Sequence, residues 1–180
     1  MKKTLFHLLL LWVSFGTTAA VAQESTFVQE YLERLENSRK YLLLVAEMMP
    51  EESYHYKATP ASMSFAEHLM HIAWAMDWHS QSLMGERAAR DWNTDIELQV
   101  EKKTKAEMMV KVDETFRHTI AFINQFDTAR LGERLDYFGA DRTKRQILLL
   151  LADHITHHRA QMLVSLRLKG LQPPRYVLYQ

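Results

Sequence analysis

The apolar positions of the chain fall into four stretches with helical spacing. The first stretch has five apolar residues at near-helical intervals: Phe27, Tyr31, Leu35, Leu42 and Val45. Proline cannot continue a helix, so the proline after Met49 ends this stretch. Each of the other three opens with a Ser or Thr followed three residues later by Glu or Gln, the capping-box signature of a helix start. These pairs are Ser64–Glu67, Thr104–Glu107 and Thr143–Gln146.

The pattern predicts an all-α domain, a four-helix bundle with helices near 26–49, 64–84, 104–126 and 143–169. Gly170 is the expected C-terminal cap of the last helix, because prolines follow closely and glycine suits the conformation after a helix end. No stretch alternates clearly enough between polar and apolar residues to predict a strand. The connection from the second to the third helix is longer than bundle loops usually are, which makes it a candidate lid or crossover.

The first 22 residues have the parts of a secretory signal peptide. Two lysines lead into an apolar run that one histidine interrupts, and the small-x-small sequence Ala20-Val21-Ala22 follows. The apolar run is shorter than the roughly 20 residues that span a bilayer, so we favour removal over a membrane anchor. We predict cleavage after Ala22, an exported, periplasmic domain over residues 23–180, and no stable membrane association after cleavage.

Charge and cysteine content exclude several classes of protein. The 22 basic and 22 acidic side chains cancel, and no block of like charges runs along the chain, so we expect no nucleic-acid partner. The chain has no cysteine, which excludes disulfides, thiolate ligands and a cysteine nucleophile. A metal site in this protein must therefore use histidines and carboxylates.

Histidines cluster in the last predicted helix, at positions 154, 157 and 158. At 100° per residue, His154 and His158 lie about 40° apart, on the apolar face of that helix. Two histidines at i and i+4 can reach one metal ion. The second helix offers His71 on an inward sector, with His68 about 60° away on the same helix. We predict a metal site of His71, His154 and His158, and leave open whether His68 or His157 contributes.

The alternative is that each histidine has a structural role. A single core-facing histidine is usually a hydrogen-bonded residue without a metal. Three imidazoles among Leu, Ile and Met side chains would be costly to bury without a shared partner, which favours a metal. An all-imidazole site suits zinc first and nickel or iron after it, and three histidines leave coordination positions open.

Two segments carry a family resemblance. Residues 64–73, Ser-Phe-Ala-Glu-His-Leu-Met-His-Ile-Ala, resemble the second-helix signature of the DinB/YfiT family, which has a ligand histidine seven positions after a Ser or Thr start. Residues 154–161, His-Ile-Thr-His-His-Arg-Ala-Gln, resemble the family's fourth-helix motif, usually His-x-x-His-His-Arg-Gly-Gln. Residues 166–170, followed by a proline, continue this motif. The resemblance spans nearly all of residues 23–180 in helix order.

This resemblance implies a four-helix bundle with a three-histidine metal site. Matched by position, His71, His154 and His158 are the ligands, and His157 is the middle histidine that does not bind metal. Ala160 stands where the family usually has glycine, a change that could narrow a cavity. Family members are mostly cytoplasmic, so the predicted export signal leaves the substrate open.

These observations favour a divalent-metal-binding protein, a metal-dependent hydrolase or transferase that acts on an unknown small molecule. Some relatives are thiol-dependent S-transferases. The alternative is a non-catalytic metal-binding or stress-response protein, or a homodimeric interaction module. A pocket open to the metal would favour an enzyme, whereas a site sealed by Trp74 and Trp78 would favour the alternative. A ferritin-like di-iron site needs paired Glu-x-x-His motifs, and the chain has one such spacing, at Glu52.

We expect structural roles for the remaining conspicuous side chains. We predict surface positions for His55, His79 and His118. Trp74 and Trp78 are interpreted as core filling. Glu67 and Asp153 could orient the imidazoles, although a capping-box role explains Glu67 and a surface position suits Asp153. Arg159 either steers an anion or faces the solvent.

Overall fold

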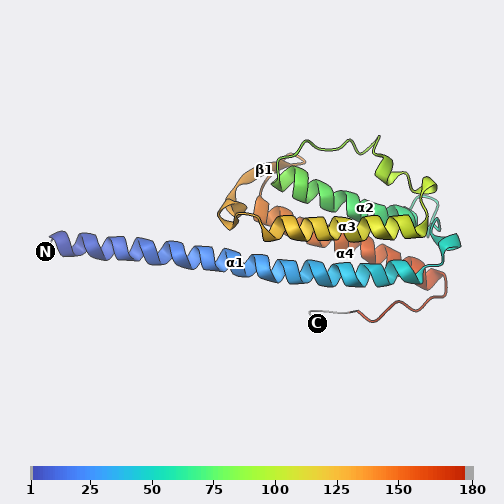
Figure 1. The fold of residues 1–180 in the computed structure, drawn as a ribbon, viewed down its shortest axis with the longest axis horizontal. Helices are drawn as coiled ribbons and strands as arrows, with labels where there is room; N and C mark the ends of the chain where they lie inside the picture. Colours follow the sequence, from blue (N-terminus) through green and yellow to red (C-terminus); the bar gives the residue numbers. More distant parts are fainter. Residues whose placement is uncertain (1, 177–180) are drawn as a thin grey trace.

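The computed structural model describes residues 2–176, with side chains for residues 23–176 apart from Glu97. Four α-helices form a bundle (Figure 1): α1 (Lys2–Met48), α2 (Phe65–Asp77), α3 (Lys105–Asn124) and α4 (Lys144–Leu168). The connections contain five short helical segments: η1 (Glu51–Ser53), η2 (Trp78–Met84), η3 (Ile96–Leu98), η4 (Val100–Lys102) and η5 (Thr128–Gly132). A hairpin of β1 (Arg134–Tyr137) and β2 (Ala140–Thr143) leads into α4.

The helix boundaries follow local chemistry. All three predicted capping boxes are present: the N-cap hydroxyl accepts a backbone N–H three residues on, in the pairs Ser64–Glu67, Thr104–Glu107 and Thr143–Gln146. The end of α4 is the predicted one, since Gly170 has a φ of 74° and its N–H donates to the Arg167 carbonyl at 2.9 Å. The predicted helix limits therefore hold to within a few residues for α3, for α4 and for the start of α2.

The core lies where the four helices meet. α2 packs against α3 and α4, and α1 packs against the same two helices from the other side (Figure 1). On α1, Tyr31, Leu35, Leu42 and Val45 are buried, and Phe27 packs against them at the edge. The apolar spacing of the first predicted helix thus identifies its buried face.

Two local features depart from the predicted all-α bundle. The helix that begins at Phe65 changes into a π-helix at Trp78, and this segment, η2, continues to Met84. The β1–β2 hairpin was not predicted. Its turn residues Phe138 and Gly139 have φ values of 54° and 80°, the left-handed pair of a two-residue type I′ turn. The fold is therefore mostly helical, with one hairpin beside the bundle.

The prediction for the N-terminal segment cannot be compared with side-chain packing. α1 includes most of the predicted signal, but the side chains of residues 1–22 lie outside the described part of the chain. The cleavable signal stays a prediction. Among the helices whose residues are described in full, none is long and apolar enough to cross a membrane.

Candidate metal centre

Three histidines converge between α2 and α4. His71 projects from α2, and His154 and His158 project from α4, one turn apart. One nitrogen of each lies within 4.8 Å of those of the other two. The ring centroids are 4.3 Å apart for His71 and His158, 4.5 Å for His154 and His158, and 4.8 Å for His71 and His154. Three nitrogens bound to one zinc ion at roughly 2.0–2.1 Å lie closer together than 4.8 Å, so the rings would have to turn inward to hold an ion.

Burial keeps the three imidazoles in the form that binds metal. It lowers the pKa of His71 to about 4, that of His154 to about 4 and that of His158 to about 3. Neighbouring histidines lower these pKa values further, because a positive charge on one ring disfavours a charge on the next. The cluster is therefore neutral at pH 7, and a metal ion needs neutral imidazoles.

Two nitrogens of the cluster lack a partner in the protein. Nδ1 of His71 and Nε2 of His154 are buried and make no hydrogen bond. Leaving such atoms unpaired costs about 1–3 kcal/mol each, so an unpaired buried group calls for an explanation. An ion bound by both nitrogens would supply one. The residues present thus fit a metal ion.

His68 lies next to the cluster, on the turn of α2 that precedes His71, and contacts His158. Its Nδ1 lies 2.9 Å from Nδ1 of His158, and its side chain is buried. This hydrogen bond occupies one nitrogen of His158 and leaves Nε2 for the cluster. Ligand histidines in metal sites commonly have the second ring nitrogen bonded in this way. His157, in contrast, is exposed on α4 and lies outside the cluster.

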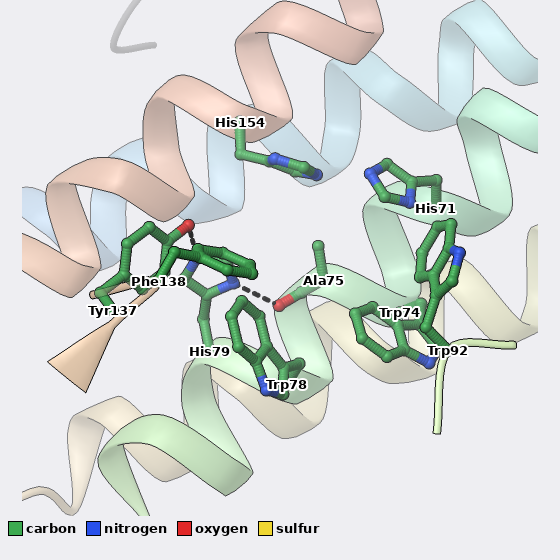
Figure 2. A pocket seen from close by; sticks show the side chains of 9 residues that line it. All are labelled: His71, Trp74, Ala75, Trp78, His79, Trp92, Tyr137, Phe138 and His154. Carbon is green, nitrogen blue, oxygen red and sulfur yellow. Dashed lines mark hydrogen bonds between the residues drawn. The ribbon is translucent and has the colours of Figure 1, made fainter. Parts of the chain in front are cut away.

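A pocket of about 400 Å³ opens beside the cluster (Figure 2). His71 and His154 form part of its wall and point towards each other. The remaining lining residues are Trp74, Ala75, Trp78, His79, Trp92, Tyr137 and Phe138. Trp74 and Trp78 therefore line the pocket, and the interpretation of these two as core filling was wrong. They do not seal the site, because the pocket that they line also reaches His71 and His154.

His79 was predicted at the surface, and this prediction was wrong. Its side chain is 1% exposed, whereas His55 and His118 are exposed as predicted. Nδ1 of His79 lies 2.7 Å from the Ala75 carbonyl, which only accepts, so this nitrogen carries the proton. Nε2 then accepts the Tyr137 hydroxyl at 3.2 Å (Figure 2), and burial lowers the pKa of His79 to about 4.

The sequence gives a reason for the error at His79. On an ideal α-helix this residue lies about 80° from His71, at the edge of the inward sector. In η2 the backbone bonds run from i to i+5, so each residue turns the chain by less than 100°. The wider turns bring His79 back towards the pocket. The sequence did offer one signal for a buried His79: it follows Ala75 by four residues, a spacing at which its side chain can bond the Ala75 carbonyl.

The connection between α2 and α3 covers part of the pocket, in agreement with its prediction as a candidate lid or crossover. Trp92 packs edge-on against His71, with ring centroids 4.6 Å apart. The Trp74 indole N–H donates to Oδ2 of Asp95 at 2.9 Å, and Arg90 also pairs with Asp95. These contacts fix the connection over the second helix.

The remaining candidates have other roles. Glu67 completes the capping box of α2, and Asp153 is 80% exposed near Arg34, so neither contacts the cluster. Arg159 neither faces the solvent nor reaches the pocket. It is buried and lies 5.2 Å from the Tyr41 ring and 5.4 Å from the Tyr176 ring, where it holds the C-terminal segment against the bundle. Ala160 is exposed and does not line the pocket.

Comparison with known proteins identifies the family. The DinB family model matches residues 23–179. The chain belongs to the DinB family. An uncharacterized protein, YjoA of Bacillus subtilis, is 25% identical over 129 residues, which cover 70% of this chain and 80% of YjoA. The family membership inferred from the two histidine motifs is thereby confirmed.

Solved structures of DinB-like proteins have the same fold. The structure of YjoA superposes with a TM-score of 0.63 at 23% identity, over 83% of this chain and 96% of that one. A DinB-like protein from Bacillus cereus gives a TM-score of 0.63 at 20% identity, over 82% and 93%. At this level of identity the likeness concerns the fold, and function must be argued from the site.

Proposed function

We propose that this DinB-family protein binds one divalent metal ion through His71, His154 and His158. Their convergence, their neutral state at pH 7 and the two unpaired buried nitrogens support the proposal. Zinc is the first choice, with nickel and iron after it, because imidazole nitrogens suit all three ions.

The observation that carries a catalytic function is the pocket beside the cluster. Three protein ligands leave an open coordination position, which distinguishes catalytic zinc sites from closed structural ones. A bound ion supplies a Lewis acid and lowers the pKa of a bound water to about 7. His71 and His154 hold the cluster at the pocket wall, so a molecule in the pocket can reach that position.

We therefore propose a metal-dependent hydrolase or transferase that acts on a small molecule. The open pocket favours this function over a non-catalytic metal-binding or stress-response protein. Tyr137 and His79 hold each other in place at one wall of the pocket, and Trp92 packs edge-on against His71 at another. We further propose that the protein works outside the cytoplasm. The signal-like start of the chain supports this, and the family match begins directly after it, at residue 23.

Metal analysis of the purified protein tests the site. We expect about one equivalent of zinc, nickel or iron per chain in the wild type and almost none in a His154→Ala/His158→Ala variant, which lacks two of three ligands. A His118→Ala variant serves as control, because His118 is exposed on α3. Circular dichroism establishes that each variant is folded. Equal metal content in the wild type and the double variant would rule out the site.

A further inference from the structure

The walls of the pocket beside the histidine cluster are mainly aromatic. Five aromatic side chains, Trp74, Trp78, Trp92, Tyr137 and Phe138, surround it (Figure 2). Trp74 and Trp78 stack with centroids 6.0 Å apart, and Trp78 lies 5.5 Å from Phe138. Such walls favour an apolar or aromatic body, since burying apolar surface is the main gain on binding.

The polar atoms of these walls are largely engaged within the protein. The Trp74 N–H is bound by Asp95, and the ring nitrogens of His79 are bound by Ala75 and Tyr137. Among lining side chains of the described residues, the buried polar atoms without a partner are Nδ1 of His71 and Nε2 of His154. The buried polar atoms that this pocket offers to a ligand are therefore those of the histidine cluster.

The net charge of the metal-loaded site determines which ligand group can bind the metal. Three neutral imidazoles add no charge, so a divalent ion would keep its charge of two. No charged residue lines the described pocket, and the Asp95 carboxylate nearby is already paired with Arg90 and bound to the Trp74 N–H. An uncompensated charge in a poorly solvated site attracts an anion strongly.

We infer that the pocket takes a compact molecule with an apolar, ring-sized body and one anionic group that binds the metal. A volume of about 400 Å³ is towards the small end of ligand pockets, which run from about 300 to 1,000 Å³. The inference rests on the proposed metal site and adds the class of ligand. A cationic ligand is disfavoured because the metal would repel it, although aromatic faces attract cations.

Binding to the protein loaded with Co²⁺ tests this inference. Benzohydroxamate and acetohydroxamate share one anionic head and differ in the body, and phenyltrimethylammonium offers the same ring with a cation. The visible Co²⁺ spectrum and tryptophan fluorescence report binding. We expect benzohydroxamate to bind about tenfold more tightly than acetohydroxamate, because the pocket buries its ring. Phenyltrimethylammonium should not compete, and the metal-free protein should bind neither hydroxamate measurably.

Variants of the pocket wall test which side chains cause the preference for benzohydroxamate over acetohydroxamate. Phe138→Asn removes a ring at the pocket rim, and its side chain is 81% exposed, so the fold should persist. Trp78→Ala removes an inner ring. Both should reduce the tenfold preference, with acetohydroxamate binding unchanged. Leu44→Ala, at an exposed position on α1, is the control and should keep the full preference.

The outcomes separate the two proposals. A protein that fails to hold Co²⁺ would contradict the metal site itself. A protein that holds Co²⁺ but binds both hydroxamates equally, or prefers phenyltrimethylammonium, would leave the metal site standing and overturn the ligand class. Equal benzohydroxamate binding with and without Co²⁺ would also overturn it, since the anion would then not meet the metal.

Discussion

At the scale of single residues, His68 is a positioning residue for the proposed metal ligand His158. The bond of 2.9 Å between their Nδ1 atoms fixes the orientation of the His158 ring. We predict that His68→Ala weakens metal binding by about 10–100-fold, as loss of such partners typically does. His68→Asn should recover much of the affinity, because its amide can occupy the position of Nδ1. Competition with a chelator measures the affinity.

The stoichiometry of metal binding distinguishes positioning from ligation. At saturating metal, His68→Ala should still hold one ion per chain, with an altered Co²⁺ spectrum. His118→Ala, an exposed histidine on α3, should match the wild type in both measurements. If His68→Ala loses the ion entirely at saturation, His68 is a ligand itself and the assignment of roles must change.

The sequence predicts the cluster better than its surroundings, for a physical reason. His154 and His158 share a helical face by their spacing alone, so their convergence needs no tertiary information. The contact of His68 with His158 depends on how closely α2 packs against α4, which spacing within one helix does not report. The place of His79 depends on a local π-helix, for which the sequence offers no comparable signature.

At the scale of elements, the β1–β2 hairpin depends on its turn. Gly139 has a φ of 80°, a conformation that side chains other than glycine rarely adopt. We predict that Gly139→Ala lowers the free energy of unfolding by about 1 kcal/mol, or the melting temperature by about 2–4 °C. Gly132→Ala is the matched control, since its added Cβ would meet no atom within 4 Å. Thermal melts of both variants make the comparison.

The same turn connects stability to the pocket. Tyr137 ends β1 directly before the turn, and its hydroxyl holds His79. Gly139→Ala should therefore also speed amide exchange around Tyr137, more than Gly132→Ala does. If both variants melt and exchange alike, the turn conformation is not what stabilises this hairpin.

Element prediction succeeded where local chemistry decides the structure. The capping boxes at Ser64, Thr104 and Thr143 mark helix starts because the hydroxyl and the carboxylate or amide satisfy backbone groups within four residues. The hairpin was missed because each strand has four residues, too few for alternation to stand out. Its turn sequence, Phe138-Gly139, also lacks the Asn or Asp that is typical of the first position of a type I′ turn.

At the scale of the whole molecule, an ion-pair network ties together three segments at the end of the bundle near the hairpin. Glu133, after η5, accepts Arg130 through both oxygens at 2.8 Å and the buried ammonium of Lys144, in the first turn of α4, at 2.8 Å. Glu86, after η2, bonds Arg130 and Lys144 from the other side and holds a φ of 62°. The network therefore joins the end of η2, which carries Trp78 and His79, to the start of α4, which carries His154 and His158.

This network predicts how stability changes in acid. Hydrogen bonds from Arg130 and then Lys144 lower the pKa of Glu133 from 4.5 to about 2. A carboxylate whose pKa is lower when folded stabilises the protein above the unfolded pKa, and this contribution is lost as the pH falls towards the folded value. Glu133→Gln should therefore melt below the wild type at pH 7, and the gap should close between about pH 4.5 and pH 2. Added salt should also narrow it, because the side chains of Arg130 and Glu133 are 39% and 44% exposed. Glu114→Gln, an exposed change on α3 outside the network, should show no such pH-dependent gap. A gap for Glu133→Gln that stays constant down to pH 2 would mean that its carboxylate does not stabilise the fold through Arg130 and Lys144.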